Sequence, residues 1–339
     1  MDARVLSRHV TRTVVRGRYL LILIVGGLMA AVMVRTAGRA PSNDWLEFES
    51  AARFLVHYHH LSAYNGHALS LYSVLPAIQI GPPAVLPVAA LQWLSPYTVS
   101  RIFVGLMVLL CLAAVASVER AARTAREAGF DQTSANVALI GGCIVMVDWT
   151  WCIVHWRHLD DAMALTLTAI AGYLIATRRP WWLIGLLIGT AVAAKPWAVV
   201  LTPVLMGLPR EARSKAILGT LAVAGAWWTP FVIGSSGTIG ALGGYHIGVD
   251  HGSVLWLVGI TGDVQRWLRP VQFIGGISAG VLIARVGGRW WLAAPLAGIA
   301  VRVLTDPFTW GYYGMGPILF ALLWDLTRPT NRRLPTYTV

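Results

Sequence analysis

The sequence predicts an all-α polytopic membrane protein built as a bundle of about ten transmembrane helices. Hydrophobic residues fill 56% of the 339 positions, and charged residues fill only 12%, about half the share of charge found in average soluble domains. The mean hydropathy is +0.63. Apolar runs of about 15 to 20 residues, long enough to cross a hydrocarbon core, recur along the whole chain.

The apolar runs define the expected elements in chain order. The expected spans are roughly 19–38, 100–118, 133–151, 161–177, 181–195, 197–208, 215–233, 270–285, 290–304 and 311–326. Two other apolar runs, 83–94 and 254–268, are shorter and end in proline or charge. Because a helix of about 12 residues covers only about 18 Å of a core of about 30 Å, we expect both runs to form interfacial or re-entrant helices.

The distribution of charge orients the bundle. The net charge is +12, and with both termini in the cytoplasm the inner side receives 18 of the 27 lysines and arginines, as the positive-inside rule requires. The basic residues form short clusters between apolar runs and no aromatic-basic platform, which argues against nucleic-acid binding. We therefore expect one multi-pass cell-membrane domain, 1–339, with a basic cytoplasmic N-terminus (1–18) and a cytoplasmic tail (327–339).

The first candidate site lies in a large extracytoplasmic loop, 39–99. Residues 44–58 have helical spacing, and Asp44 and Glu47 lie three apart beside an apolar face. That face comprises Trp45, Phe48, Ala52 and Leu55. Asp44 could simply be an N-cap with Glu47 at N3. A capped interfacial helix would also fix a carboxylate at the membrane surface, so Asp44 and Glu47 are candidate catalytic residues.

Further candidates follow the third expected span. Arg157 and His158 precede the adjacent carboxylates Asp160 and Asp161. These residues could cap a span, bind a phosphate-bearing substrate through Arg157, or hold a divalent metal. A metal site needs at least three convergent ligands, and no ExxH or HxxxH spacing supplies them. We therefore favour substrate binding and expect neither a metal nor another cofactor.

Lys195 ends a continuous apolar run, 181–194. A cation there is costly unless it reaches the interface or a partner, so it either snorkels to the lipid headgroups or binds an anion. His246 and Asp306, in other outer loops, complete the expected substrate-binding set.

These motifs have a common order and sidedness. They are Asn43-Asp44-Trp45, Leu71-Tyr72, Gly81-Pro82-Pro83, Asp160-Asp161, Lys195-Pro196 and Asp306-Pro307 before Tyr312-Tyr313. Over about residues 20–325 the pattern resembles the GT-C superfamily of integral membrane glycosyltransferases. It is most similar to glycosyltransferase family 87, whose members resemble polyprenol-phosphate-mannose-dependent mannosyltransferases.

The resemblance implies a GT-C-like bundle with interfacial helices in the first extracytoplasmic loop. It implies transfer of a sugar, mannose favoured, from a polyprenyl-phosphate donor to an extracytoplasmic lipid or glycan acceptor. Asp44 would be the general base, and Lys195, Arg157 and the histidines would stabilise the departing lipid phosphate.

Two other functions remain open from the residues alone. The chain could transport or flip a lipid-linked sugar, or serve as a non-catalytic membrane subunit of a cell-envelope glycan pathway. Transport commonly uses ionisable groups near the bilayer midplane or interrupted helices in repeated halves. Here the acids lie at span ends on one side, which favours chemistry at the interface.

Overall fold

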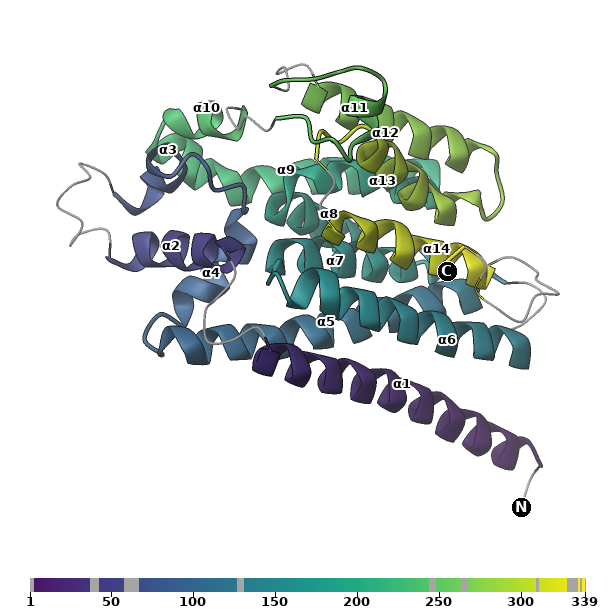
Figure 1. The fold of residues 1–339 in the computed structure, drawn as a ribbon. Helices are drawn as coiled ribbons and strands as arrows, with labels where there is room; N and C mark the ends of the chain where they lie inside the picture. Colours follow the sequence, from purple (N-terminus) through teal and green to yellow (C-terminus); the bar gives the residue numbers. More distant parts are fainter. Residues whose placement is uncertain are drawn as a thin grey trace.

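The computed structural model describes residues 3–36, 43–57, 67–126, 131–243, 248–263, 268–308, 311–327, 335 and 337–338. Every named element within these ranges is a helix (Figure 1). Extended pairing there is limited to an isolated bridge between Gly248 and Asp263. The predicted all-α class is therefore confirmed.

The helices follow one another along the chain with short connections. The α-helices are α1 (Ala3–Thr36), α2 (Asn43–His57), α3 (Leu71–Val74), α4 (Pro82–Ala90), α5 (Pro96–Ala125), α6 (Gln132–Trp149), α7 (Leu159–Ala176), α8 (Trp181–Ala194), α9 (Arg210–Gly234), α10 (Gly237–Gly243), α11 (Val254–Leu257), α12 (Leu268–Arg285), α13 (Ala294–Leu304) and α14 (Met315–Thr327). A π-helical turn, η3 (Thr150–Val154), extends α6. The 3₁₀ segments are η2 (Ala68–Ser70), η4 (Pro196–Gly207), η5 (Trp290–Ala293) and η6 (Gly311–Gly314).

Five described helices are long and apolar enough to cross a membrane. They are Gly17–Arg35 within α1, α5, Gln132–Val154, α7 and α9. Other expected spans form shorter apolar helices, of which α8 has 14 residues and η4 has 12. A 3₁₀ helix rises about 2.0 Å per residue, so η4 covers about 24 Å where an α-helix of that length would cover about 18 Å. The expected count of about ten spans stays a prediction.

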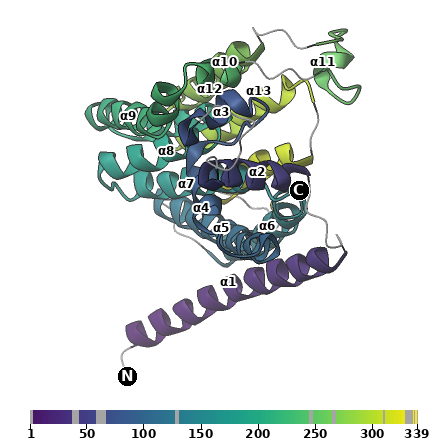
Figure 2. The ribbon, with the colours of Figure 1, turned by 90° about the vertical axis from the view of Figure 1, so that its left-hand side faces the viewer.

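Helices α2, α3 and α10 gather at one end of the bundle, on the left of Figure 1 and facing the viewer in Figure 2. The predicted apolar face of α2 is confirmed at Trp45, Phe48 and Ala52, which are fully or almost fully buried. Helix α4 has nine residues, about 14 Å of helix, which is too short to cross a bilayer. The helix in the run 83–94 is therefore too short to span the membrane, as predicted.

The expected helix over 254–268 is wrong. Helix α11 ends at Leu257, and the chain then turns through Gly259 and Gly262, both at φ +85°. Glycine tolerates this left-handed backbone because it has no Cβ. The described part of the run is therefore one short helical turn followed by irregular backbone.

Glycines let the central helices approach closely. Gly185 and Gly189 lie four apart on α8, and a Cβ on Gly189 would lie 2.7 Å from the Thr220 carbonyl oxygen of α9. Helix pairs in membranes commonly pack through small residues at this spacing. On the other side of the bundle, Gly276 of α12 and Gly298 of α13 pack against Val200 of η4.

The end of the bundle opposite α2 contains a buried charge cluster. Glu119 of α5 lies 3.1 Å from Arg18 Nη2 of α1 and accepts a hydrogen bond of 2.8 Å from the Tyr19 hydroxyl. Arg123 also pairs with Glu119, while Arg18 Nη1 donates to the Ala135 carbonyl of α6. The cluster ties α1, α5 and α6 together.

The turn before α4 is fixed to the end of α8, and this contact yields a prediction of stability. Gly81 N donates to the Ala194 carbonyl at 2.9 Å, and a Cβ on Gly81 would overlap the Ala193 carbonyl oxygen. We expect Gly81→Ala to destabilise the protein by about 1–3 kcal/mol, because backbone must move to make room. Thermal unfolding in detergent measures the change.

Gly105→Ala in α5 is the matched control, since a Cβ there has no neighbour within 4 Å. Alanine is also the better helix former, so this variant should be as stable as the parent or more so. Equal melting temperatures for the two variants would contradict the tight contact at Gly81.

Candidate functional site

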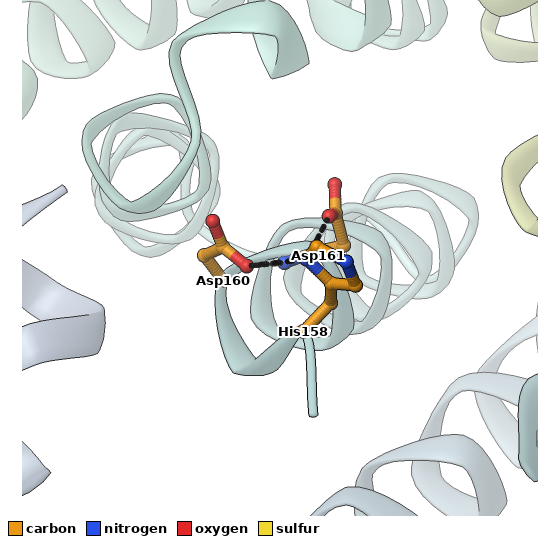
Figure 3. Close-up of side chains that lie close together, drawn as sticks. All are labelled: His158, Asp160 and Asp161. Carbon is orange, nitrogen blue, oxygen red and sulfur yellow. Dashed lines mark hydrogen bonds and ion pairs between the residues drawn. The ribbon is translucent and has the colours of Figure 1, made fainter. Parts of the chain in front are cut away.

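The connection from α6 to α7 positions the centre of the site. Helix α6 ends in the π-helical turn η3, where His158 N donates to the Ile153 carbonyl at 3.0 Å. Arg157 then adopts φ +60°, an uncommon conformation for a residue with a side chain. This reversal brings the side chains of His158, Asp160 and Asp161 together (Figure 3). Such π-helical turns occur frequently at functional sites.

Asp160 and Asp161 are buried, and Lys195 offsets one of their two negative charges. Lys195 Nζ lies 2.6 Å from Asp160 Oδ2 and 3.6 Å from Asp161 Oδ2. Trp197 Nε1 donates to Asp161 Oδ1 at 2.8 Å. Buried carboxylates require such partners because the loss of hydration is costly. Lys195, expected to snorkel or to bind an anion, instead contacts two carboxylates of its own chain.

Asp44 reaches this group through His158. His158 Nε2 lies 3.4 Å from Asp44 Oδ2, and His158 Nδ1 lies 3.5 Å from Asp161 Oδ2. The Asp44 side chain is 36% exposed, whereas that of His158 is 7% exposed. Asp44 is therefore the accessible carboxylate, and the imidazole lies between it and the buried pair.

The first turn of α2 also places Glu47 beside Asp44. Helix α2 begins at Asn43, so Asp44 lies within its first turn. Asp44 is therefore not the N-cap that the sequence also allowed. Desolvation raises the pKa of Glu47, and the neighbouring Asp44 carboxylate adds to the increase. The expected adjacency of the two carboxylates is thus present, with Glu47 on an exposed part of the helix.

Two tyrosines and an arginine, which the sequence did not single out as site residues, complete the group. The Tyr312 ring centroid lies 3.9 Å from that of His158. The Arg302 guanidinium lies 4.2 Å from the Tyr313 ring centroid and 4.6 Å from that of Trp197. Cations bind well over such aromatic faces.

Asp306, a predicted site residue, lies beside these aromatic rings. Its Oδ2 is 3.5 Å from Arg302 Nη2 and 3.6 Å from Arg269 Nη1. Burial raises the pKa of Asp306, and the two arginines act in the opposite direction. The i,i+4 spacing of Arg302 and Asp306 could have indicated their ion pair from the sequence. Tyr312 and His158 are far apart in the sequence, and no spacing indicates their contact.

The remaining predicted residues lie apart from this group or cannot be placed. Arg157 occupies the reversal before α7, and its Nε is buried without a hydrogen-bond partner among the described residues. Desolvation lowers the pKa of Arg157. His246 lies outside the described residues.

His158, Asp160 and Asp161 offer potential metal ligands within 4.8 Å of one another. One imidazole and two carboxylates would suit a divalent cation by ligand type. However, Lys195 Nζ lies 2.6 Å from one of the carboxylates, so an ammonium group already supplies half the positive charge that a divalent metal would bring. A metal at these ligands would therefore compete with Lys195 for the carboxylate oxygens.

Comparisons with protein-family models, curated proteins and solved structures give no match for this chain.

Proposed function

We propose that the protein is a membrane glycosyltransferase that moves a sugar, with mannose favoured, from a polyprenyl-phosphate donor to a lipid or glycan acceptor outside the cytoplasm. The observation that supports this most directly is the approach of Asp44 to His158. It joins an accessible carboxylate from the first loop to the buried Asp160, Asp161 and Lys195 at the start of α7.

Asp44 is the general base in this proposal. An acceptor hydroxyl attacks the anomeric carbon, the carbon–oxygen bond to the lipid phosphate breaks, and the hydroxyl proton passes to the Asp44 carboxylate. His158 lies 3.4 Å from that carboxylate and orients it. The adjacent Asp161 keeps the imidazole in place from its other side.

The departing phosphate carries negative charge and needs cations or hydrogen-bond donors. Lys195 is a weaker candidate than its position in the sequence suggested, because Asp160 and Asp161 already share its charge. Arg302 is a second candidate: it lies over two aromatic rings of the same group, and it shares its charge with one carboxylate, that of Asp306. Arg269 also pairs with Asp306, with its Nη1 3.6 Å from Asp306 Oδ2.

The proposal is tested with radiolabelled polyprenyl-phosphate mannose, glucose and arabinose as donors. Membranes containing the protein are compared with matched empty membranes, and label in extracted lipid and glycan is counted. Transfer from at least one donor above the empty control is the expected result. No transfer from any of them would favour a transporter or a non-catalytic subunit.

Replacing Glu47 with glutamine should stabilise the protein at neutral pH and have little effect on stability in acid. Desolvation and then the Asp44 carboxylate raise the pKa of Glu47, so ionising this carboxyl destabilises the folded state as the pH rises through that pKa. Glutamine removes this cost. Thermal unfolding of the parent and the variant at about pH 4 and about pH 8, on either side of ordinary carboxyl values, measures the difference. Transfer should be retained, and its complete loss would make Glu47 the base.

A further inference from the structure

A cavity of about 380 Å³ lies at the opposite end of the bundle, where α12, η5 and α14 meet. Its walls include Arg289, Trp290, Trp324 and Thr327, together with the backbone of Gly287 and Gly288. We propose that this cavity binds the phosphate headgroup of an anionic glycerophospholipid. This binding site is independent of the proposed transfer reaction.

Two helices separate the cavity from the candidate site. Helix α12 begins beside Arg269, which pairs with Asp306, and ends at Arg285, about 24 Å further along the helix axis. Helix α14 follows Tyr312 and Tyr313 and reaches Thr327 over about 18 Å. The cavity therefore cannot share a ligand headgroup with His158 and Asp160.

The same end of the bundle holds the basic clusters. Arg126 Nη1 lies 3.5 Å from the Leu326 carbonyl of α14 and also contacts Ser134 at the start of α6. The buried pair of Arg18 and Glu119 lies on the neighbouring turns of α1 and α5. The positive-inside rule assigns this end to the cytoplasm, and the cytoplasmic leaflet is the one enriched in anionic lipids.

Arg289 supplies a charge that the described residues do not neutralise. Its Nη1 donates to the Thr327 carbonyl at 3.2 Å, and no described carboxylate forms an ion pair with it. Asp325, the acid of α14, instead accepts hydrogen bonds from Tyr337 N and from Thr338 N and Oγ1. The guanidinium therefore keeps several donors for a phosphate, the anion its fork geometry suits.

The other walls favour a lipid over free phosphate. The Trp290 and Trp324 ring centroids lie 4.7 Å apart, and Trp290 is 39% exposed. Tryptophan gathers at the membrane interface, where the indole ring contacts both headgroup and acyl chain. Gly287 and Gly288 have open space where a Cβ would lie, so a ligand can approach their backbone. A glycerophospholipid uses the charge and the apolar walls, whereas inorganic phosphate uses only the charge.

The test compares lipids on the purified full chain in detergent. Binding of phosphatidylglycerol and of diacylglycerol with identical acyl chains, which lacks the phosphate, is measured by native mass spectrometry. We expect phosphatidylglycerol to bind about tenfold more tightly, the value of one charge-assisted hydrogen bond. Arg289→Met should abolish this preference, whereas Arg285→Met, which removes the same charge from the exposed end of α12, should keep it.

Three outcomes would overturn the proposal: equal binding of both lipids to the parent protein, equal loss in Arg285→Met and Arg289→Met, or equally tight binding of glycerol phosphate without acyl chains. Trp290→Leu provides a second test, since it leaves the bond from Arg289 to Thr327 in place. This variant should weaken phosphatidylglycerol binding without affecting thermal unfolding in the absence of lipid. Unchanged binding in Trp290→Leu would also count against the proposal.

Discussion

Asp44→Asn should lower sugar transfer by at least about 100-fold and leave the fold unchanged. Removing a general base typically costs a factor of about 10² to 10⁴ in rate. The asparagine side chain has almost the same shape, and Asp44 is 36% exposed, so water can hydrate the new amide. His158 keeps its contacts with Asp161 and Tyr312 in this variant.

The measurement uses membranes containing the parent protein or the variant at matched abundance. Label transferred from the active polyprenyl-phosphate donor is counted, and thermal unfolding verifies the fold. Glu47→Gln, one turn further along α2, is the control and should retain transfer. Equal transfer by Asp44→Asn and the parent would remove Asp44 as the base and direct attention to Glu47 or to Asp160 and Asp161.

Lys195→Met should destabilise the protein by about 3–5 kcal/mol, the typical cost of breaking a buried ion pair by removing one partner. Methionine is of similar length but leaves Asp160 and Asp161 buried with no ammonium group beside them. The free energy of unfolding in mixed detergent micelles measures the effect. Adding Asp160→Asn to this variant should restore part of the stability, because the double variant has one buried charge fewer.

Lys215 provides a matched control within the same chain. It pairs with Glu211 one helical turn away, and both side chains are at least half exposed. Exposed pairs of this kind contribute about 0.3–0.5 kcal/mol, so Lys215→Met should unfold almost as the parent does. Equal stability of Lys195→Met and Lys215→Met would contradict the claim that Lys195 stabilises the buried carboxylates of α7.

The fold class followed from hydropathy, whereas the count of about ten spans stays a prediction. Hydropathy locates apolar runs but gives no information on the rise per residue. The run 197–208 lies largely in the 3₁₀ helix η4, which covers more distance than an α-helix with the same number of residues. The run 254–268 is apolar enough for a helix, yet Gly259 and Gly262 end it in left-handed backbone. Local conformation outweighed apolar composition at this second run.

The site could be predicted where residues are close in sequence. The pairing of Asp44 with Glu47 follows from a single helical turn. The ion pair between Asp160 and Lys195 spans 35 positions, so sequence spacing could not distinguish it from a phosphate ligand. The contact between His158 and Tyr312 depends on how the turn after η3 packs against η6, which periodicity alone does not determine.

The charge balance between α7 and α8 has a consequence for biogenesis. The two helices are joined by a short turn and pack directly against each other, with Asp160 and Asp161 at the start of one and Lys195 at the end of the other. A translocon releasing α7 alone would deliver two unpaired acids to the lipid, whereas a preformed hairpin delivers an internal ion pair. These two helices should therefore partition into the bilayer as one unit, after the ribosome has completed residue 195.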